Sequence, residues 1–369
     1  MVLERSHLSL PPGGAGTGCA EAPLARALQP PGLAVTRLAA PPGSAWQEVA
    51  AAAHLALAGP WYAAIRNAYG HEPLYLEARA PQGAAVLPAF VLRRPLLGTV
   101  VASMPFLDAG GPAGDPALAG PLLARLRREA EACGAALLEV RSLVPLPLPV
   151  EPSLSKITLI RRLAPDPDTV WRQLPATVRN RVRKAENSGV SVEVGGAELL
   201  EAFYRVFAVN MRDLGSPVHG RAFFRALFQA FGGAARIVLA RRQGRPVGGL
   251  YTLVHGDTLS APWASALRAE AVYSPNTLCY WEALRLGCRD GLAAFDFGRS
   301  TVDSGTHRFK RQWGTQPHQL YWYSLPLGGR AVTVSARAGH WDLLSRVWRL
   351  LPVGVTRLLG PPLRRLLSQ

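Results

Sequence analysis

The feature that most restricts the fold is a succession of predicted elements that occurs twice: helix, β-meander, helix, strand. The segments that follow the leading helices are 73–112, 116–134 and 135–143 in the first copy, and 235–265, 276–291 and 293–300 in the second. No residue-level repeat is visible. At 369 residues the chain is long enough for two domains, so an internal duplication of one α/β module is expected.

Turn and cap residues delimit these elements. Pro81, Gln82 and Gly83 separate two alternating apolar runs, which is a hairpin signal. Ser44 is a candidate N-cap for a helix over 45–57, ahead of the first meander. Helices over 197–215 and 220–233 are predicted ahead of the second meander. Strands over 155–163 and 320–327 flank the second copy.

The predicted organisation has four parts. Residues 1–32 are rich in Gly, Pro and Ala and are expected to be disordered. The first module spans 33–155 and the second module spans 156–328. The tail, 329–369, has Leu, Trp and Val at helical spacing with Arg between them. Two interpretations of the tail stay open: a helix packed on the second module, or a basic amphipathic segment on an anionic membrane surface.

The charge of the chain points to an anionic partner. The formal net charge is +16, and nearly all of the positive charge is arginine. Phosphate, RNA, anionic polysaccharide and a membrane surface all fit this charge. DNA is not expected, and nucleic-acid binding in general is the weaker interpretation, because no aromatic side chains are interleaved with the basic clusters in a stacking pattern.

Cysteines and apolar runs bear on the cellular location. The four cysteines are widely spaced without a CxxC pair, which predicts reduced thiols and no metal site. Neither a signal peptide nor a stretch of about 18 apolar residues is recognised. A cytoplasmic protein is therefore expected, with peripheral contact at the inner membrane face as an open alternative.

Polar chemistry is concentrated in "FDFGRSTVDSGTHRFKRQWG", residues 295–314. The first residues alternate as a strand, and Gly298 allows the backbone to bend. Arg299 and Ser300 then project from the end of the strand. Ligands of open α/β sheets gather at such strand ends, so both residues are candidates for binding substrate or an anion.

The second half of this stretch adds charged groups. Asp303 lies in a predicted turn, and a short helix is predicted from Thr306, as N-cap, to Gly314. Arg308 and Lys310 on that helix cannot both face the core. Lysine occurs only three times in this chain, and it acts as a compact point charge, whereas arginine suits bidentate anion binding.

A basic helix is predicted within 176–188. Arg179 and Arg183 are spaced i, i+4, as are Asn180 and Lys184, which gives one strongly cationic side. A solvated basic helix and an anion-binding helix are both compatible with this pattern.

Two further segments carry candidate binding residues. Asn210, Arg212 and Asp213 lie in a polar link between two helices, and Asp213 is also a candidate general base. Trp263 lies at the mouth of the second meander, where it could stack on a ring or a sugar. A half-buried core position is the alternative for this tryptophan.

Several motifs together resemble one family. "RNRVRKAENSGV", "NMRDLGSPVHGRAFF", "PWASALR", "SPNTLCYWEAL" and the 295–314 stretch are similar to FemAB-related proteins associated with PEP-CTERM/exosortase and exopolysaccharide gene clusters. These proteins belong to the Fem-type, GNAT-like acyltransferases. The resemblance covers roughly residues 32–325. It implies an α/β (α+β) fold of two tandem GNAT-like subdomains, with mixed sheets flanked by helices.

The resemblance also implies roles for residues. Lys310 matches the lysine of the Fem "FK..FG" segment, which implies oxyanion or phosphate stabilisation. Asp303 and His307 are candidates for the general base by their location alone, and Arg308 is a further candidate catalytic residue. Arg179, Arg183 and Lys184 match the basic helix near precursor phosphates. The chain lacks the long coiled-coil arm that some Fem proteins insert.

The implied activity is acyl or aminoacyl transfer to an amine of a cell-envelope precursor or an exopolysaccharide sugar. Acyl-CoA or aminoacyl-tRNA would be the co-substrate, and no bound cofactor or metal is needed. The acceptor would be an anionic small molecule or a lipid- or nucleotide-linked sugar. The alternative is a non-catalytic GNAT-like protein that binds or assembles polysaccharide at the membrane.

Overall fold

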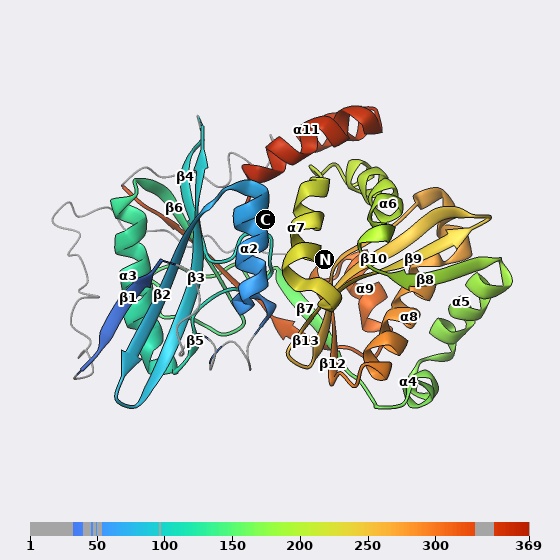
Figure 1. The fold of residues 1–369 in the computed structure, drawn as a ribbon, viewed down its shortest axis with the longest axis horizontal. Coiled ribbons are helices and arrows are strands. Elements are labelled where there is room, and N and C mark those ends of the chain that lie inside the picture. The colour runs from blue at the N-terminus through green and yellow to red at the C-terminus, as the bar shows by residue number, and fades with distance from the viewer. Residues whose placement is uncertain are drawn as a thin grey trace, which may run out of the picture.

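The computed structural model describes most of the chain. The described residues are 32–39, 46, 49, 54–95, 97–328 and 343–368. The segment expected to be disordered therefore lies outside them, apart from Gly32. Figure 1 shows two β-sheets with helices between them and on their outer faces.

The first sheet has the strand order β1-β2-β3-β4-β6-β14, with β5 paired to β3. Its strands are β1 (Ala34–Leu38), β2 (Glu72–Ala80), β3 (Gly83–Arg94), β4 (Gly98–Ala102), β5 (Ala113–Gly114), β6 (Ala135–Ser142) and β14 (Tyr321–Pro326). Strands β4 and β6 are parallel, because the helix α3 (Ala119–Ala132) carries the chain back across the sheet between them.

The second sheet has the order β13-β7-β12-β11-β10-β9-β8. Its strands are β7 (Lys156–Arg162), β8 (Val190–Gly195), β9 (Ala235–Arg242), β10 (Arg245–His255), β11 (Thr258–Ala266), β12 (Ala294–Thr301) and β13 (Gln316–Gln319). The parallel pair β11–β12 is joined through α8 (Pro275–Arg289), as β4–β6 is joined through α3. The predicted repeat of one mixed α/β module is thereby confirmed.

The helices form three layers (Figure 1). Helices α2 (Gly59–Tyr69), α6 (Leu200–Asp213) and α7 (Arg221–Phe231) lie between the sheets, α3 covers the first sheet, and α4 (Pro167–Gln173), α5 (Ala176–Asn187) and α8 cover the second. Further helices are α9 (Gly305–Arg311) and α11 (Val353–Arg365), and residues 343–350 are also helical. Short 3-10 turns lie at Leu55–Leu57, Pro116–Leu118, Ala197–Leu199, Gly232–Ala234 and Arg268–Tyr273. One aromatic core, including Trp61 and Phe223, joins both modules in the central layer.

The helix before the first meander differs from the predicted one. Residues 55–57 form a 3-10 turn, and most of the remaining predicted range 45–57 lies outside the described residues. The long helix is α2, which was not predicted. Pro60 fits its first turn, where no N–H partner is lost, and Gly70 ends it with φ of +65°.

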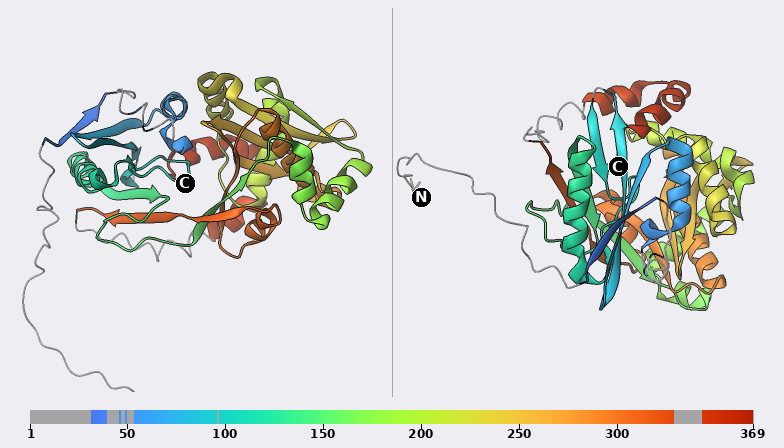
Figure 2. Two further views of the ribbon diagram at one scale, coloured as in Figure 1. Left: turned by 90° about the horizontal axis from the view of Figure 1, so that it is seen from below. Right: turned by 60° about the vertical axis from the view of Figure 1, so that its left-hand side comes forward.

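One strand crosses between the modules. Residue Leu320 alone separates β13 in the second sheet from β14, which pairs antiparallel with β6 of the first sheet. By contrast, β7 is the first strand of the predicted second module and pairs within the second sheet, with β12 and β13. Ser153, shortly before β7, pairs with Trp322 of β14, and the two segments run together in the left view of Figure 2. The division at residue 156 stays a prediction, but the last strand of the second module belongs to the first sheet.

We expect a cavity-forming substitution in β14 to destabilise the first module. Leu325 is buried among first-module side chains, and Leu325→Ala should lower the free energy of unfolding by about 2–4 kcal/mol. Hydrogen exchange should speed up in β6, its partner strand. Val302→Ala, at an exposed position, is the control. Faster exchange confined to second-module strands would contradict the strand crossing.

Candidate functional site

A break in the second sheet creates the site. The parallel pairing of β11 with β12 ends at Ser260 and Asp296, and the register of β12 against β7 shifts between Asp296 and Arg299. Gly298 lies in this bulge with φ of +72°, a conformation that favours glycine. The bulge takes backbone N–H and C=O groups out of the regular ladder, so they need other partners.

Charged side chains supply those partners. Asp296 Oδ1 accepts from the N–H of Gly298 at 2.8 Å, and Asp108 Oδ2 accepts from the N–H of Arg299 at 3.0 Å. Lys310 Nζ donates to the carbonyl oxygens of Gly298 at 3.0 Å and Arg299 at 2.8 Å. Three charged groups from separate segments therefore converge on two residues of β12.

Lys310 is held there by α9. Ser304, rather than the predicted Thr306, is the N-cap of this helix, because its Oγ accepts from the N–H of His307 at 3.2 Å. Lys310 is only 9% exposed, and burial lowers its pKa from 10.5 to about 8, against the opposing effect of the Asp108 and Asp296 carboxylates. An ammonium has three N–H donors, and the two carbonyls occupy two of them. One donor is left for a ligand oxygen.

The first module contributes Asp108 from the loop that follows β4. Its Oδ1 lies 3.2 Å from Nη1 of Arg299, so this carboxylate contacts both the backbone and the side chain of one residue. A Cβ on Gly298 would lie 3.9 Å from Lys310 Nζ and 4.0 Å from Asp108 Oδ2. A lysine of the second module and a carboxylate of the first module thus face the same small space.

Arginines make the surroundings of this space cationic. The guanidinium groups of Arg141 and Arg299 lie over the ring of Trp322, at 4.9 and 5.3 Å from its centroid. Arg141 also contacts Glu139 Oε2 at 3.2 Å. Arg364 is close by: burial lowers its pKa to about 10, and the charges of Arg299 and Arg141 act in the same direction. A cluster of this charge favours an anionic group of a substrate.

A buried hydrogen-bonded chain fixes Arg364. Its Nε donates to Nε2 of His219 at 3.0 Å, so the imidazole proton is on Nδ1, which lies 2.5 Å from Tyr69 Oη. Burial and the nearby Arg364 and Arg299 keep the pKa of His219 well below 6.5. The neutral imidazole positions Arg364 and is itself packed on Phe223.

The structure brings only part of the predicted catalytic set together. Lys310 and Arg299 lie in the site. Ser300 is buried, with its Oγ free of any hydrogen-bond partner among the described residues. The Asp303 side chain is 90% exposed, and the exposed Arg308 donates to its carbonyl oxygen at 2.8 Å. Asp303 and Arg308 therefore lie outside the Lys310–Asp108 space.

The other predicted binding residues lie in the central part of the molecule, and Asn210, Arg212 and Asp213 belong to the last turn of α6 rather than to a link between helices. Trp263 stacks on Trp61 at 6.0 Å, across the two modules, and is partly buried. Asn210 Nδ2 donates to Ser265 Oγ at 3.1 Å. Arg212 and Asp213 are paired with each other at 2.6 Å.

The predicted basic helix is α5, on the outer layer of the second module (Figure 1). Arg179 donates to the carbonyl oxygen of Leu174 at 2.6 Å, which caps α4, and Arg183 lies over Trp171 at 5.6 Å. Lys184 is exposed. These three residues stand apart from the Lys310–Asp108 space and form an outer cationic surface.

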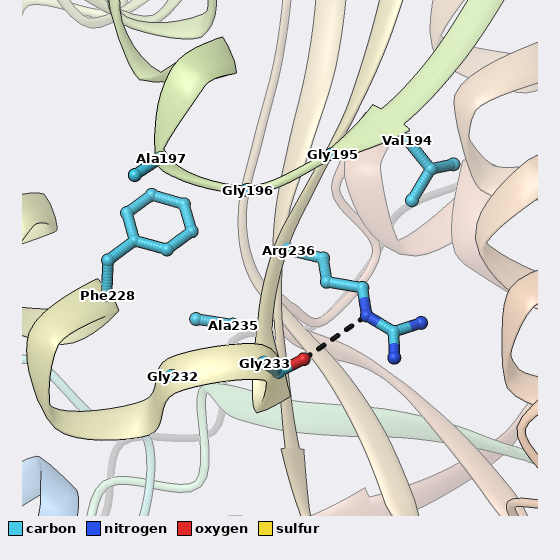
Figure 3. Close-up of a pocket in the computed structure, with 9 residues that line it drawn as sticks. All are labelled: Val194, Gly195, Gly196, Ala197, Phe228, Gly232, Gly233, Ala235 and Arg236. Carbon is cyan, nitrogen blue, oxygen red and sulfur yellow. Dashed lines mark hydrogen bonds between the residues drawn. The ribbon is translucent and has the colours of Figure 1, made fainter.

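A separate hollow of about 550 Å³ lies at the ends of β8 and β9 (Figure 3). It is lined mainly by glycine, alanine and apolar side chains. Its one charged residue, Arg236, pairs with Asp290 at 2.7 Å and donates to the carbonyl oxygen of Gly233. This hollow offers no group for acid–base or acyl-transfer chemistry.

Several residues of the site were not predicted, namely Asp108, Arg141, Trp322, Tyr69 and Arg364. They come from segments that the sequence pattern assigned only as strands, turns or tail. One local feature of the sequence marks Asp108 as a polar residue in a turn: it lies just before the glycines Gly110 and Gly111. In the described part of the chain, no cluster of three or more His, Cys, Asp or Glu could hold a metal ion.

Comparisons with known proteins agree with this architecture. Residues 172–311 match the model of the acetyltransferase (GNAT) domain family, which includes β12 and Lys310. The crystal structure of FemX is similar, with a TM-score of 0.56 and 13% identity over 72% of this chain and 91% of that chain. A tandem GNAT protein from the clavulanic acid biosynthesis pathway has a TM-score of 0.51 and 15% identity over 81% of this chain and 99% of that chain. The search of curated proteins gives no significant match.

These findings define the class. The fold is a tandem GNAT-like α/β fold, and the matched domain supports an acyltransferase. The similarity to FemX, at this identity, concerns the fold.

Lys310 should make stability depend on pH. Its pKa falls from 10.5 in the unfolded chain to about 8 in the fold, so between these values the unfolded chain binds a proton that the folded chain has lost. The free energy of unfolding should therefore rise by about 1.4 kcal/mol per pH unit in that window, through this residue alone. Urea unfolding at pH 7–10, wild type against Lys310→Met, isolates the effect. A pH-independent difference between the two proteins would contradict the buried ammonium.

Proposed function

We propose that the chain transfers an acyl group from an activated ester or thioester to an amine of an anionic acceptor, at the space between the two modules. The observation that carries the proposal is the buried Lys310 ammonium, with one N–H unused, opposite the carboxylate of Asp108. The GNAT-like architecture and the domain match support the same class of reaction.

The residues suggest the course of the reaction. The acceptor nitrogen attacks the carbonyl carbon of the donor, and the carbonyl oxygen takes the negative charge. The free N–H of Lys310 stabilises this oxyanion in a buried, weakly screened position. Collapse of the intermediate breaks the C–O or C–S bond to the donor. Asp108 attracts the acceptor amine, takes the proton that the nitrogen loses and passes it to the leaving oxygen or sulfur, so that the donor leaves as an alcohol or a thiol. We assign this role to Asp108 in place of Asp303, whose side chain is exposed.

The turn before α8 favours aminoacyl-tRNA over acyl-CoA as donor. Phosphates bind best at helix N-termini behind glycine-rich loops, where backbone N–H groups are accessible. The turn 267–274, between β11 and α8, contains no glycine, and it carries Glu270, which pairs with Arg242 at 3.5 Å. A CoA diphosphate would meet this carboxylate. The outer basic surface around Lys184 would suit a tRNA backbone.

The arginine cluster suggests the acceptor class. Arg141, Arg299 and Arg364 are matched by few carboxylates, which suits a phosphate-bearing molecule. We infer that the acceptor is a lipid- or nucleotide-linked amino sugar or peptide of the cell envelope. An exopolysaccharide precursor of a PEP-CTERM/exosortase system is the narrower form of this proposal.

A donor–acceptor screen tests the reaction class. The purified chain would be incubated with labelled acetyl-CoA or with labelled aminoacyl-tRNA, and with nucleotide-linked amino sugars as acceptors. Label should move from aminoacyl-tRNA to the acceptor amine. Transfer from acetyl-CoA alone would overturn the donor assignment. Transfer from neither donor would overturn the proposed function.

Lys310 should control the rate. Lys310→Met should lower kcat/KM about 10²–10³-fold, and Lys310→Arg should retain part of the activity because it keeps a cation. In the wild type, kcat/KM should fall above pH 8, where the ammonium loses its proton, and Lys310→Arg should move this fall to higher pH. A rate that rises through pH 8 in the wild type and lacks that rise in Lys310→Arg would make Lys310 a base instead.

Asp108→Asn should separate positioning from proton transfer. The amide oxygen can still accept from the N–H of Arg299, so the fold should persist. We expect kcat/KM to drop about 100-fold. Asp303→Asn, at the exposed turn, is the matched control and should keep most of the activity. The reverse order of the two variants would return the role of base to Asp303.

A further inference from the structure

The tail carries an uncovered apolar face. Residues 343–350 are helical and are followed by α11. Of the 16 large apolar side chains that are exposed among the described residues, eight lie in residues 343–363. Leu350 is 85% exposed, Leu358 75% and Leu343 62%. Surface apolar residues are usually scattered, so a concentration of this kind marks an interaction surface. We call it the tail face.

The tail face cannot turn inward, because the opposite side of α11 is fixed. Thr356, Gly360 and Arg364 are spaced by four residues and are buried. A Cβ at Gly360 would lie 2.7 Å from Val218 Cγ1, so only glycine allows this close approach. Arg364 bonds to His219. The other side of α11, which carries the exposed Leu358 of the tail face, therefore points away from the protein.

The charge around the tail face selects an anionic occupant. Arg346, Arg349, Arg357 and Arg365 lie in the same segment, and residues 343–369 contain no aspartate or glutamate. None of these four arginines forms a salt bridge with another described residue. Exposed leucines with unneutralised arginines suit a surface that is apolar inside and negative outside. A bilayer with anionic lipids has this profile.

The dimensions favour a helix that lies on the membrane. With 13 residues, α11 is about 20 Å long, and no helix of the described residues is long and apolar enough to cross a bilayer. Pro361 and Pro362 lie inside α11, which also suits a surface segment more than a spanning one. Figure 1 shows α11 at the rim of the molecule, above α6 and α7.

We propose that the tail face docks the protein on an anionic membrane surface. The docked helix, α11, also carries Arg364 and places it beside His219. Docking of α11 would therefore bring the site between the modules close to the lipid headgroups. A lipid-linked acceptor could then be reached from the membrane. The docking itself does not depend on the proposed acyl transfer.

Vesicle co-sedimentation tests the proposal. The full chain would be mixed with vesicles of phosphatidylcholine alone, or with a third of phosphatidylglycerol. We expect binding to the mixed vesicles and at least about tenfold weaker binding to the neutral ones. The double variant Leu350→Glu/Leu358→Glu should lose binding at least about tenfold, since it removes apolar contact and adds negative charge. Val272→Glu, at a position 59% exposed outside the tail, is the matched control and should bind as the wild type does.

Other results would overturn the proposal. Equal binding of the double variant and the wild type would show that the tail face is not the contact. Absence of binding to mixed vesicles would exclude membrane docking. A concentration-dependent dimer, abolished by the double variant and seen in light scattering without lipid, would assign the tail face to a second copy of the chain. The circular dichroism spectrum of the double variant should match that of the wild type, which would show that a loss of binding does not come from misfolding.

Discussion

The return of β14 to the first sheet is the constraint on which the rest of the structure depends. This strand follows the strands of the second module but pairs with β6 at the edge of the first sheet, so the first sheet is not complete without the end of the second module. The aromatic core between α2 and α7 adds a second connection. Together they fix the relative position of the modules, as required by a site that combines Lys310 of the second module with Asp108 of the first.

Local backbone chemistry then places the charges. The bulge at Gly298 exposes two N–H groups and two carbonyls, and burying them unpaired would cost free energy comparable to the lost hydrogen bonds. Asp296, Asp108 and Lys310 satisfy them. Two of these groups, Lys310 and Asp108, also carry the proposed chemistry. Structural need and proposed catalytic use therefore coincide at these residues, and a substitution at Lys310 should affect both.

Part of this arrangement could be predicted from the sequence. Turn residues and apolar periods gave the repeated order of elements, and the run 295–314 identified the correct strand end and Lys310. Sequence periodicity reports only which faces are buried, so it could not tell that β14 pairs with β6. Asp108 and Arg364 reach the site through contacts between residues far apart in the chain, about which local patterns carry no information. The helix α2 was not predicted, although Pro60 at its start and Gly70 at its end are local helix signals.

The two modules differ where they would be expected to be alike. In the first module, the loop 103–111 fills the space beyond the ends of the parallel strands β4 and β6. The N–H of Gly110 donates to the carbonyl oxygen of Arg141, and Ser103 Oγ accepts from the N–H of Arg141. In the second, the corresponding space is the one that Lys310 and Asp108 face. Under the proposed acyl transfer, the duplicated chain would bind one equivalent of donor per molecule. The first module would then serve as one wall of the site that the second module carries.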